Sequence, residues 1–206
     1  MKLYFVRHGQ TLGNMTRDYS TTAHDVLSPK GVEQAEQLAE RLAKYEFDFI
    51  YSSPLERAVK TIAPYLQRNG RKAELWPELS EGCWQQEWDA PVPKRKQQAT
   101  PLTVDEELRS LFHWEENASF PHEDEVYQES VQRLAQGQEK LLARHAGQKG
   151  NILLVGHWYQ TSRTIEALMA LPRANYERFH HSNTGLSYLY QRKDGRFVLE
   201  FLNRTS

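Results

Sequence analysis

The sequence is poor in several features that would narrow its class. It contains one cysteine, Cys83, so no disulfide can form within the chain, which is typical of a reducing compartment. No apolar run approaches the roughly 18 residues of a membrane span, and the run before Arg7 is too short for a signal peptide. The formal net charge is −1, so no overall field favours nucleic acid or an anionic membrane. We therefore expect a cytoplasmic protein that binds neither nucleic acid nor membrane, and any positive site must be local.

The length and the apolar pattern predict an α/β protein. The 206 residues suit one domain, which we expect to span residues 1–206. Near-continuous apolar runs are typical of parallel strands covered on both faces. Such runs predict strands at 2–6, 47–52, 72–79 and 151–156, and the Asp-Gly of KDG predicts a hairpin between strands at 185–192 and 196–203. The expected fold is a three-layer α/β/α sandwich with a mostly parallel central sheet.

Helices are predicted between these strands. The segment 27–45 has Ser28 as a candidate N-cap and Pro29 at the first helical position. The segment 54–70 also shows helical spacing, and Pro64 is expected to interrupt its backbone hydrogen bonding. Two further helices are predicted over 123–146 and near 158–170.

The regular alternation is lost after residue 79, and residues from about 80 to 122 form a predicted insertion. This stretch contains Trp84, Trp88 and Trp114 with four prolines and mixed charge. A long loop inside a compact domain is more often a functional lid than a plain connection. We therefore expect the insertion to arch over the site, although a small structural cluster of its tryptophans is an equally simple interpretation.

Chemically versatile side chains follow the predicted strands. Ligands bind open α/β sheets in the crevice beyond the carboxyl ends of the strands. The residues that follow the four strands in turn are Arg7, His8 and Gly9, then Arg57 within SSPLER, then Glu81 within ELSEG, and finally His157 within GHW. Two arginines, two histidines and a glutamate therefore come from four segments toward one edge of the sheet.

These segments together resemble the histidine phosphatase superfamily, which includes cofactor-dependent phosphoglycerate mutases and many small-molecule phosphatases. The residues that carry the resemblance are RHG at 7–9, LSPKGVEQA at 27–35, YSSPLERAVKTI at 51–62, LSE at 79–81 and VGH at 155–157. They cover most of the chain in the order that the family has. An RHG tripeptide alone is weak support, whereas the ordered set is specific.

The resemblance implies roles for individual residues. It places Arg7, Arg57, His8 and His157 in a phosphate pocket and implies that His8 becomes phosphorylated. Asn14 matches an asparagine that also touches the phosphate, and Glu81 is the best counterpart of the general acid. The implied catalytic residues are thus His8, Glu81 and His157, the implied phosphate-binding residues are Arg7, Asn14 and Arg57, and no metal and no cofactor is expected.

The same chemistry follows from the residue types. Phosphoryl transfer places charge on three equatorial oxygens, and guanidinium groups bind such oxygens in a fork that lysine lacks. Their charge also disfavours protonation of His8, which keeps a ring nitrogen able to attack. Glu81 could protonate the departing oxygen if burial raises its pKa, with Glu78 as the next candidate.

Alternatives remain at the level of the sequence. His8 could simply be a hydrogen-bonded histidine at the end of a strand. His180 and His181 lack the spacing of metal ligands, and Cys83 shows no sign of thiol chemistry. A phosphoglycerate mutase-type phosphotransferase and a non-catalytic phospho-ligand module are the rival functions. Mutases commonly carry a Gly-Trp pair where this chain has Thr21 and Thr22, and few residues follow the last predicted strand. We therefore expect a phosphomonoesterase that acts on a small phosphate ester, with water as the acceptor; substrate and oligomeric state are not predicted.

Overall fold

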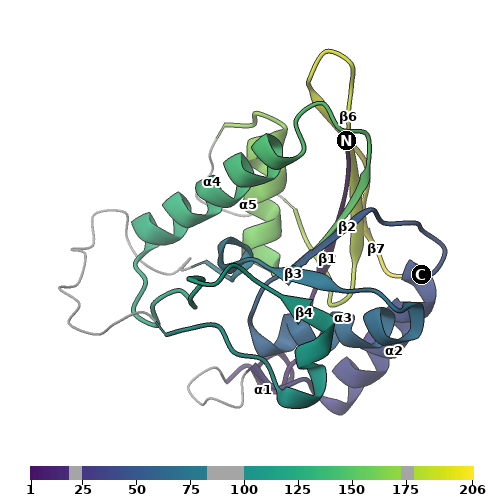
Figure 1. Cartoon of the computed structure of the whole chain (residues 1–206), viewed down its shortest axis with the longest axis vertical. Coiled ribbons are helices and arrows are strands. Elements are labelled where there is room, and N and C mark those ends of the chain that lie inside the picture. The colour runs from purple at the N-terminus through teal and green to yellow at the C-terminus, as the bar shows by residue number, and fades with distance from the viewer. Residues whose placement is uncertain (19–24, 83–99, 173–178) are drawn as a thin grey trace.

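The computed structural model describes residues 1–18, 25–82, 100–172 and 179–206, and these residues form a single seven-stranded sheet with helices on both faces (Figure 1). The strand order is β4-β3-β2-β5-β1-β6-β7. The strands are β1 Lys2–Arg7, β2 Phe49–Ser52, β3 Ala73–Leu75, β4 Phe112–His113, β5 Asn151–Gly156, β6 Leu186–Gln191 and β7 Phe197–Arg204. The helices are α1 Leu12–Thr16, α2 Pro29–Leu42, α3 Glu56–Asn69, α4 Tyr127–Arg144 and α5 Trp158–Leu168, with 3-10 turns η2 Pro77–Leu79 and η3 Glu106–Leu111.

The pairing confirms the expected fold class. Strands β1 to β5 pair in parallel, and β6 and β7 form an antiparallel hairpin that is attached to β1. The central pair β1 and β5 is in register from Lys2 opposite Asn151 to Arg7 opposite Gly156. The carboxyl ends of these two strands therefore lie side by side, which places the residues after them at one edge of the sheet.

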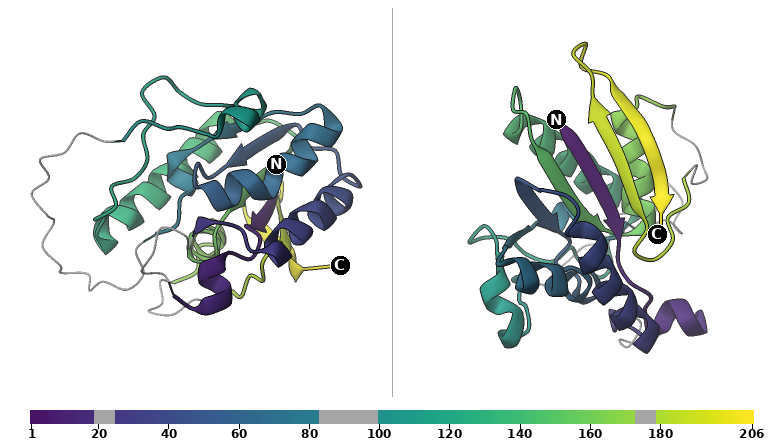
Figure 2. Two further views of the ribbon diagram at one scale, coloured as in Figure 1. Left: turned by 90° about the horizontal axis from the view of Figure 1, so that it is seen from below. Right: turned by 90° about the vertical axis from the view of Figure 1, so that its right-hand side faces the viewer.

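Alternation along β1 divides the core between the two faces. Tyr4 and Val6 pack in one cluster with side chains of α2 and α3, whereas Leu3 and Phe5 pack in the other with side chains of α4 and α5. Successive side chains of a strand point to opposite faces, so a continuous apolar run requires helices on both. Figures 1 and 2 show the resulting three layers.

Local signals account for the boundaries of α2 and α3. The Ser28 hydroxyl accepts a hydrogen bond from the Gly31 amide at 3.1 Å, and Pro29 begins α2, as predicted. Helix α3 ends at Gly70, whose φ of 59° lies in the left-handed region that favours glycine. The helix continues through Pro64, so the predicted interruption at that residue does not end it.

The segment predicted as one strand over 72–79 is divided in the structure. Strand β3 ends at Leu75, and the 3-10 turn begins at Pro77. Proline has no amide hydrogen to donate to a sheet, so the apolar run cannot continue as a strand through this residue.

The described part of the predicted insertion is built into the sheet. Strand β4 pairs in parallel with β3, with Phe112 opposite Ala73, and buries the Phe112 side chain. The central carbon of the Arg109 guanidinium lies 4.0 Å from the centroid of the Trp114 ring. Trp114 also packs against the core cluster that contains side chains of α2 and α3. Residues 83–99, with Cys83, Trp84 and Trp88, lie outside the described residues, so the lid stays a prediction.

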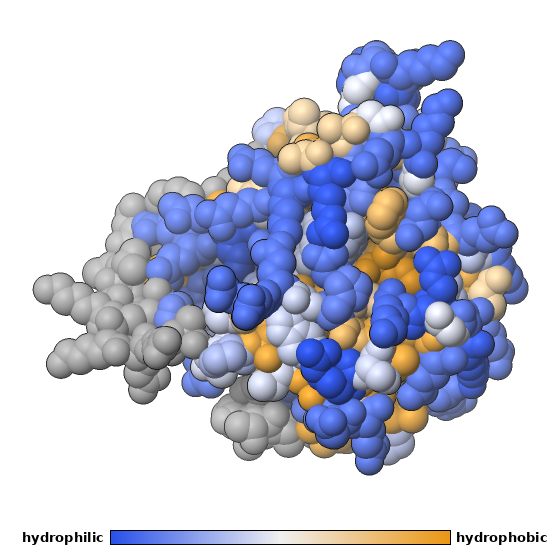
Figure 3. Space-filling view, in the orientation of Figure 1, coloured by the Kyte–Doolittle hydropathy of each residue, from blue (hydrophilic) through white to orange (hydrophobic). Residues whose placement is uncertain are grey.

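The face of the molecule in Figure 3 is largely polar, as expected for a sequence without long apolar runs. Apolar patches lie between the charged side chains of this face. Among the described residues, no helix has the length and hydropathy needed to span a bilayer.

Candidate active site

His8 and His157 lie next to each other because their strands are neighbours. Each histidine directly follows its strand, and the His8 amide donates to the Gly156 carbonyl at 2.9 Å. The ring centroids are 5.1 Å apart, and both side chains are buried. The parallel register of β1 and β5 thus builds the centre of the site from residues that are 149 positions apart (157 − 8).

The tautomer of His8 is determined by its neighbour. Its Nδ1 lies 2.7 Å from the Gly9 carbonyl oxygen, an acceptor, so Nδ1 carries the hydrogen and donates it. The lone pair is then on Nε2. Burial lowers the pKa of His8 well below its usual value, and the charges of Arg57 and Arg7 lower it further. His8 is therefore a neutral imidazole in a positively charged surrounding.

Gly9 is required by a close approach of the backbone. A Cβ atom at this position would lie 2.8 Å from the Gly31 carbonyl oxygen at the start of α2. The Gly9 amide donates to the Thr61 hydroxyl at 2.8 Å, and this hydroxyl in turn donates to the Arg57 carbonyl. The loop after β1 is thereby attached to both α2 and α3.

Arg57 connects the second histidine with an acidic residue. Its Nε donates to Nδ1 of His157 at 3.1 Å, and its NH1 donates to Oδ1 of Asp25 at 2.5 Å. Because Nδ1 of His157 accepts, its Nε2 carries the hydrogen and donates to the Ser53 hydroxyl at 2.8 Å. Burial, followed by the charge of Arg57, lowers the pKa of His157 well below its usual value. Both histidines of the pair are thus neutral.

Asp25 is a site residue that the sequence analysis missed. Its second carboxylate oxygen accepts from the Glu56 amide at 3.1 Å, which satisfies a first-turn donor of α3 beside Arg57. Asp25 therefore holds both the helix that carries Arg57 and the guanidinium itself. An isolated aspartate ahead of a helix has no spacing signal that would have identified it.

Arg7 is oriented by the segment before β6. Its NH1 donates to the His181 carbonyl at 2.8 Å, and its guanidinium lies 5.8 Å from the centroid of the Trp158 ring. The His181 side chain is buried, and burial lowers its pKa to about 4. His180 is exposed, with its ring 5.7 Å from the Trp158 ring. These two histidines thus lie beside the site, and the described part of the chain shows no metal cluster around them.

Asn14 lies in α1 at the same edge of the sheet. Its side-chain oxygen accepts from the Thr11 amide at 3.2 Å and from the side-chain amide of Asn183 at 3.2 Å. Asn183 also donates to the His8 carbonyl at 3.0 Å. Asn183 was missed by the sequence analysis, because a loop asparagine before a predicted hairpin is an ordinary residue.

Glu81 lies at the N-terminus of α5, the helix that follows His157. Its Oε1 accepts from the Gln160 amide at 3.0 Å and from the Gly82 amide at 3.2 Å. Burial raises the pKa of this carboxyl group, and the charges of Arg57 and Arg7 and the two amides only partly offset that effect. A raised pKa is what a proton donor requires. The rival Glu78 instead faces Lys140 of α4 at 3.4 Å.

The assembled groups are suited to an anionic, tetrahedral ligand. Two guanidinium groups, of Arg7 and Arg57, the neutral imidazole of His8 and the carboxyl group of Glu81, whose pKa is raised, come from three separate segments of the chain. Among the described residues, no group of three or more His, Cys, Asp or Glu side chains could hold a metal ion. The positive charge available here is that of the arginines.

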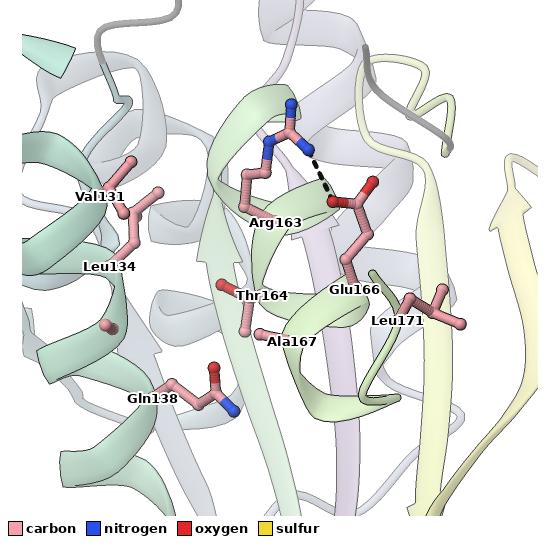
Figure 4. Close-up of a pocket in the computed structure, with 9 residues that line it drawn as sticks. Val131, Leu134, Gln138, Arg163, Thr164, Glu166, Ala167 and Leu171 are labelled. Carbon is pink, nitrogen blue, oxygen red and sulfur yellow. Dashed lines mark hydrogen bonds and ion pairs between the residues drawn. The ribbon is translucent and has the colours of Figure 1, made fainter. Parts of the chain in front are cut away.

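Two recesses of the surface lie outside this cluster. One, of about 350 Å³, borders Asp25 and is lined mainly by the first turns of α3 and the segment 103–105. The other, of about 200 Å³, is a largely apolar groove between α4 and α5 that contains the Arg163–Glu166 ion pair (Figure 4). Of these two, the first shares Asp25 with the site, and Asp25 accepts a hydrogen bond from Arg57.

The chain is similar to known phosphatases and to a probable phosphoglycerate mutase over most of its length. The family profile of the Histidine phosphatase superfamily (branch 1) matches residues 3–205. An adenosylcobalamin/alpha-ribazole phosphatase of Escherichia coli (strain K12) is 29% identical over 177 residues, 84% of this chain and 81% of that protein. A probable phosphoglycerate mutase of Erwinia tasmaniensis is 26% identical over 181 residues, 86% of this chain and 79% of that protein. The crystal structure of the alpha-ribazole phosphatase from Shigella flexneri superposes with a TM-score of 0.72 at 25% identity, covering 100% of this chain and 98% of that one.

Proposed function

The chain belongs to the histidine phosphatase superfamily (branch 1) and is a phosphatase of that superfamily, and we propose that it hydrolyses monophosphate esters of small metabolites through a phosphohistidine on His8, without a metal ion. The observation that carries the proposal is the state of His8. Its Nδ1 hydrogen is committed to the Gly9 carbonyl, which leaves Nε2 as a nucleophile beside Arg7 and Arg57.

The first step transfers the phosphoryl group to the enzyme. The lone pair of His8 Nε2 forms a bond to phosphorus while the bond from phosphorus to the ester oxygen breaks. The ester oxygen keeps the bonding electrons and takes a proton from the Glu81 carboxyl group, so an alcohol leaves. Without that proton an alkoxide would have to depart, which is unfavourable.

The second step regenerates the enzyme. The Glu81 carboxylate accepts a proton from water as the water oxygen bonds to phosphorus, and the bond from phosphorus to Nε2 breaks. The electrons of that bond return to the ring, inorganic phosphate leaves, and Glu81 is again protonated. One carboxyl group thus acts first as an acid and then as a base.

The remaining residues stabilise the charge that develops on the transferring group. Arg7 and Arg57 are the proposed ligands of the equatorial oxygens, and Asn14 adds an amide at the same edge. His157 orients Arg57 through the Nε contact and packs against the His8 ring. We propose that these guanidinium groups supply the positive charge that Mg²⁺ supplies in other phosphoryl-transfer sites.

The proposed substrate class rests on the relatives and on the recess beside Asp25. The curated relatives named above include an alpha-ribazole phosphatase, whose name indicates a small phosphorylated metabolite. The recess is lined by apolar side chains together with Lys60, Glu56 and Asp105, which suits a leaving group with both apolar and polar parts.

A panel of phosphorylated metabolites, assayed for phosphate release, tests the activity. The mechanism is tested by quenching the enzyme during turnover with labelled substrate, and we expect an acid-labile, base-stable phosphoryl group on His8. His8→Ala should abolish label and turnover, whereas the control His113→Ala, at an exposed position of β4, should retain both. Label on a serine or an aspartate would refute the phosphohistidine.

The similarity to a probable phosphoglycerate mutase over 86% of the chain makes phosphoryl transfer to a second hydroxyl the competing function. The two are separated by supplying 3-phosphoglycerate with catalytic 2,3-bisphosphoglycerate. We expect little isomer to form, and phosphate release from the best substrate of the panel should be much faster. Rapid isomerisation with negligible phosphate release would identify a mutase instead.

A further inference from the structure

Arg133 of α4 donates hydrogen bonds from both terminal nitrogens of its guanidinium group to the segment that carries Glu81. NH1 donates to the Ser80 carbonyl at 2.9 Å and, over longer distances, to the Pro77 and Glu78 carbonyls. NH2 donates to the Glu81 carbonyl at 3.0 Å. One side chain therefore binds four carbonyl groups in the stretch 77–81. This stretch contains η2 and the proposed general acid.

Glu125 completes the arrangement around the guanidinium. Its two carboxylate oxygens accept from Nε and NH2 of Arg133 at 2.7 and 2.6 Å, so the pair is bidentate. The exposed fractions are 11% for Arg133 and 13% for Glu125. A charge removed from water to this degree is costly unless it is paired. With the carboxylate on one edge and carbonyls on the other, all five N–H directions have acceptors, a pattern that lysine cannot reproduce.

Two close contacts show that α4 determines where the segment lies. A Cβ atom on Gly137 would lie 2.7 Å from Cβ of Glu78, so α4 accepts η2 only because this residue is glycine. A Cβ atom on Gly82 would lie 3.0 Å from the Tyr159 ring and 3.4 Å from the Ser130 hydroxyl. The backbone on both sides of Glu81 is therefore pressed against α4 and α5.

The two ends of Glu81 are thus held by different helices. Arg133 binds its main-chain oxygen, and the Gln160 amide at the N-terminus of α5 binds its carboxylate. We propose that the Arg133–Glu125 pair is a positioning device for the Glu81 general acid, so that α4 sets the distance from that carboxyl group to the ester oxygen. This inference rests on the proposed function, in which Glu81 protonates the leaving group.

A positioning role predicts a selective defect. Proton donation matters when the departing oxygen is strongly basic, as in an alkyl phosphate, and matters little for 4-nitrophenol. A displaced Glu81 should therefore slow alkyl phosphates and leave aryl phosphates nearly unchanged. A purely structural role would reduce the amount of folded enzyme, which lowers both rates by the same factor.

The test measures kcat/KM of the full chain for an alkyl phosphate from the metabolite panel and for 4-nitrophenyl phosphate. Arg133→Lys keeps the charge but loses the fork, and we expect a loss of about tenfold or more on the alkyl ester and less than about threefold on the aryl ester. Glu125→Gln, which leaves the guanidinium without its counter-charge, should show the same selectivity and serves if the first variant does not fold. Arg144→Lys is the matched control, because Arg144 is on the same helix and pairs with Glu74 of β3. It should affect both esters equally.

A double variant distinguishes the two hypotheses. Once Glu81→Gln has removed the acid, adding Arg133→Lys should cost the alkyl ester less than about twofold more, because coupled residues are not additive. Equal losses on both esters in Arg133→Lys, or fully additive losses in the double variant, would overturn the positioning role of Arg133. Neither result would affect the proposed role of Glu81 as the general acid. Absence of ester selectivity in Glu81→Gln itself would refute Glu81 as the acid and the positioning role with it.

Discussion

The carboxylate of Asp25 accepts a hydrogen bond from the Arg57 guanidinium, with Oδ1 2.5 Å from NH1. The side chains are 22% and 12% exposed, so the ion pair is only partly screened by water. Asp25 orients the arginine, and in the proposed mechanism its negative charge also reduces the attraction of the site for a dianionic phosphate. The orientation of Arg57 by Asp25 should favour turnover, whereas the negative charge of Asp25 should weaken the binding of phosphate.

Asp25→Asn should therefore separate the two effects. Removing the charge should lower the Ki of inorganic phosphate by several-fold, whereas kcat should fall by about tenfold because Arg57 is held less firmly. Steady-state kinetics with phosphate as inhibitor measure both. Asp194→Asn is the control, since Asp194 pairs with Arg196 in the exposed hairpin. Weaker phosphate binding in Asp25→Asn would show that orientation outweighs charge.

The pH profile of kcat/KM should retain activity below the usual pKa of histidine and decline as the pH rises through the raised pKa of Glu81. Burial lowers the pKa of His8, so this proposed nucleophile stays neutral well below the usual range of histidine. Burial raises the pKa of Glu81, which must be protonated to donate, so the rate should fall as the pH rises through that value. A pH profile with an alkyl phosphate measures this decline, which Glu81→Gln should abolish along with most of the rate. An unchanged alkaline decline in Glu81→Gln would assign it to another group.

Chelation should leave the activity unchanged. The proposed ligands of the transferring group are Arg7 and Arg57, whose guanidinium groups remain charged at any working pH. We expect the rate after exhaustive treatment with a chelator to stay within about twofold of the untreated rate, where loss of an essential Lewis acid would cost several kcal/mol of barrier. A lost rate that Mg²⁺ or Zn²⁺ restores would show that the arginines are insufficient.

The fold should lose stability in weak acid. The pKa values of His8, His157, His145 and His181 are all lowered, mainly by burial, and that of His181 to about 4. Below pH about 6.5 the unfolded chain binds protons at these residues that the folded chain does not, so the free energy of unfolding falls with pH. Each histidine that stays neutral contributes up to about 1.4 kcal/mol per pH unit to the slope of the unfolding free energy against pH. Glu81, whose pKa is raised, contributes a slope of opposite sign that is at most as large as that of one histidine.

Urea unfolding at pH values between 7 and 5 measures this slope. The midpoint should move to lower urea as the pH falls, with an unchanged m-value. A midpoint that is constant or rises over this interval would contradict the assignment of the four histidines as neutral in the folded state.

Local patterns in the sequence were sufficient for the fold class and for placing His8 and His157 at the same edge of the sheet. Continuous apolar runs require helices on both faces of a sheet, and they correctly indicated β1, β2 and β5. The Ser28-Pro29 pair correctly indicated the start of α2. Parallel strands present their carboxyl ends at one edge, so the residues that follow β1 and β5 were expected at the same edge. The strand order, which places β1 beside β5, makes His8 and His157 neighbours.

Tertiary structure decided the supporting contacts. Asp25 reaches Arg57 across 32 residues, Asn183 reaches His8 across 175, and Arg133 reaches the carbonyls of 77–81 across more than 50. Single charged or amide residues in loops and on helices have no periodicity, and nothing near them in the chain indicates their partner. Strand β4 has only two residues, too few for an alternating pattern, and it becomes a strand because β3 offers an open edge. Sequence periodicity reports which face of an element is buried, whereas the pairing of individual polar groups depends on how those elements pack.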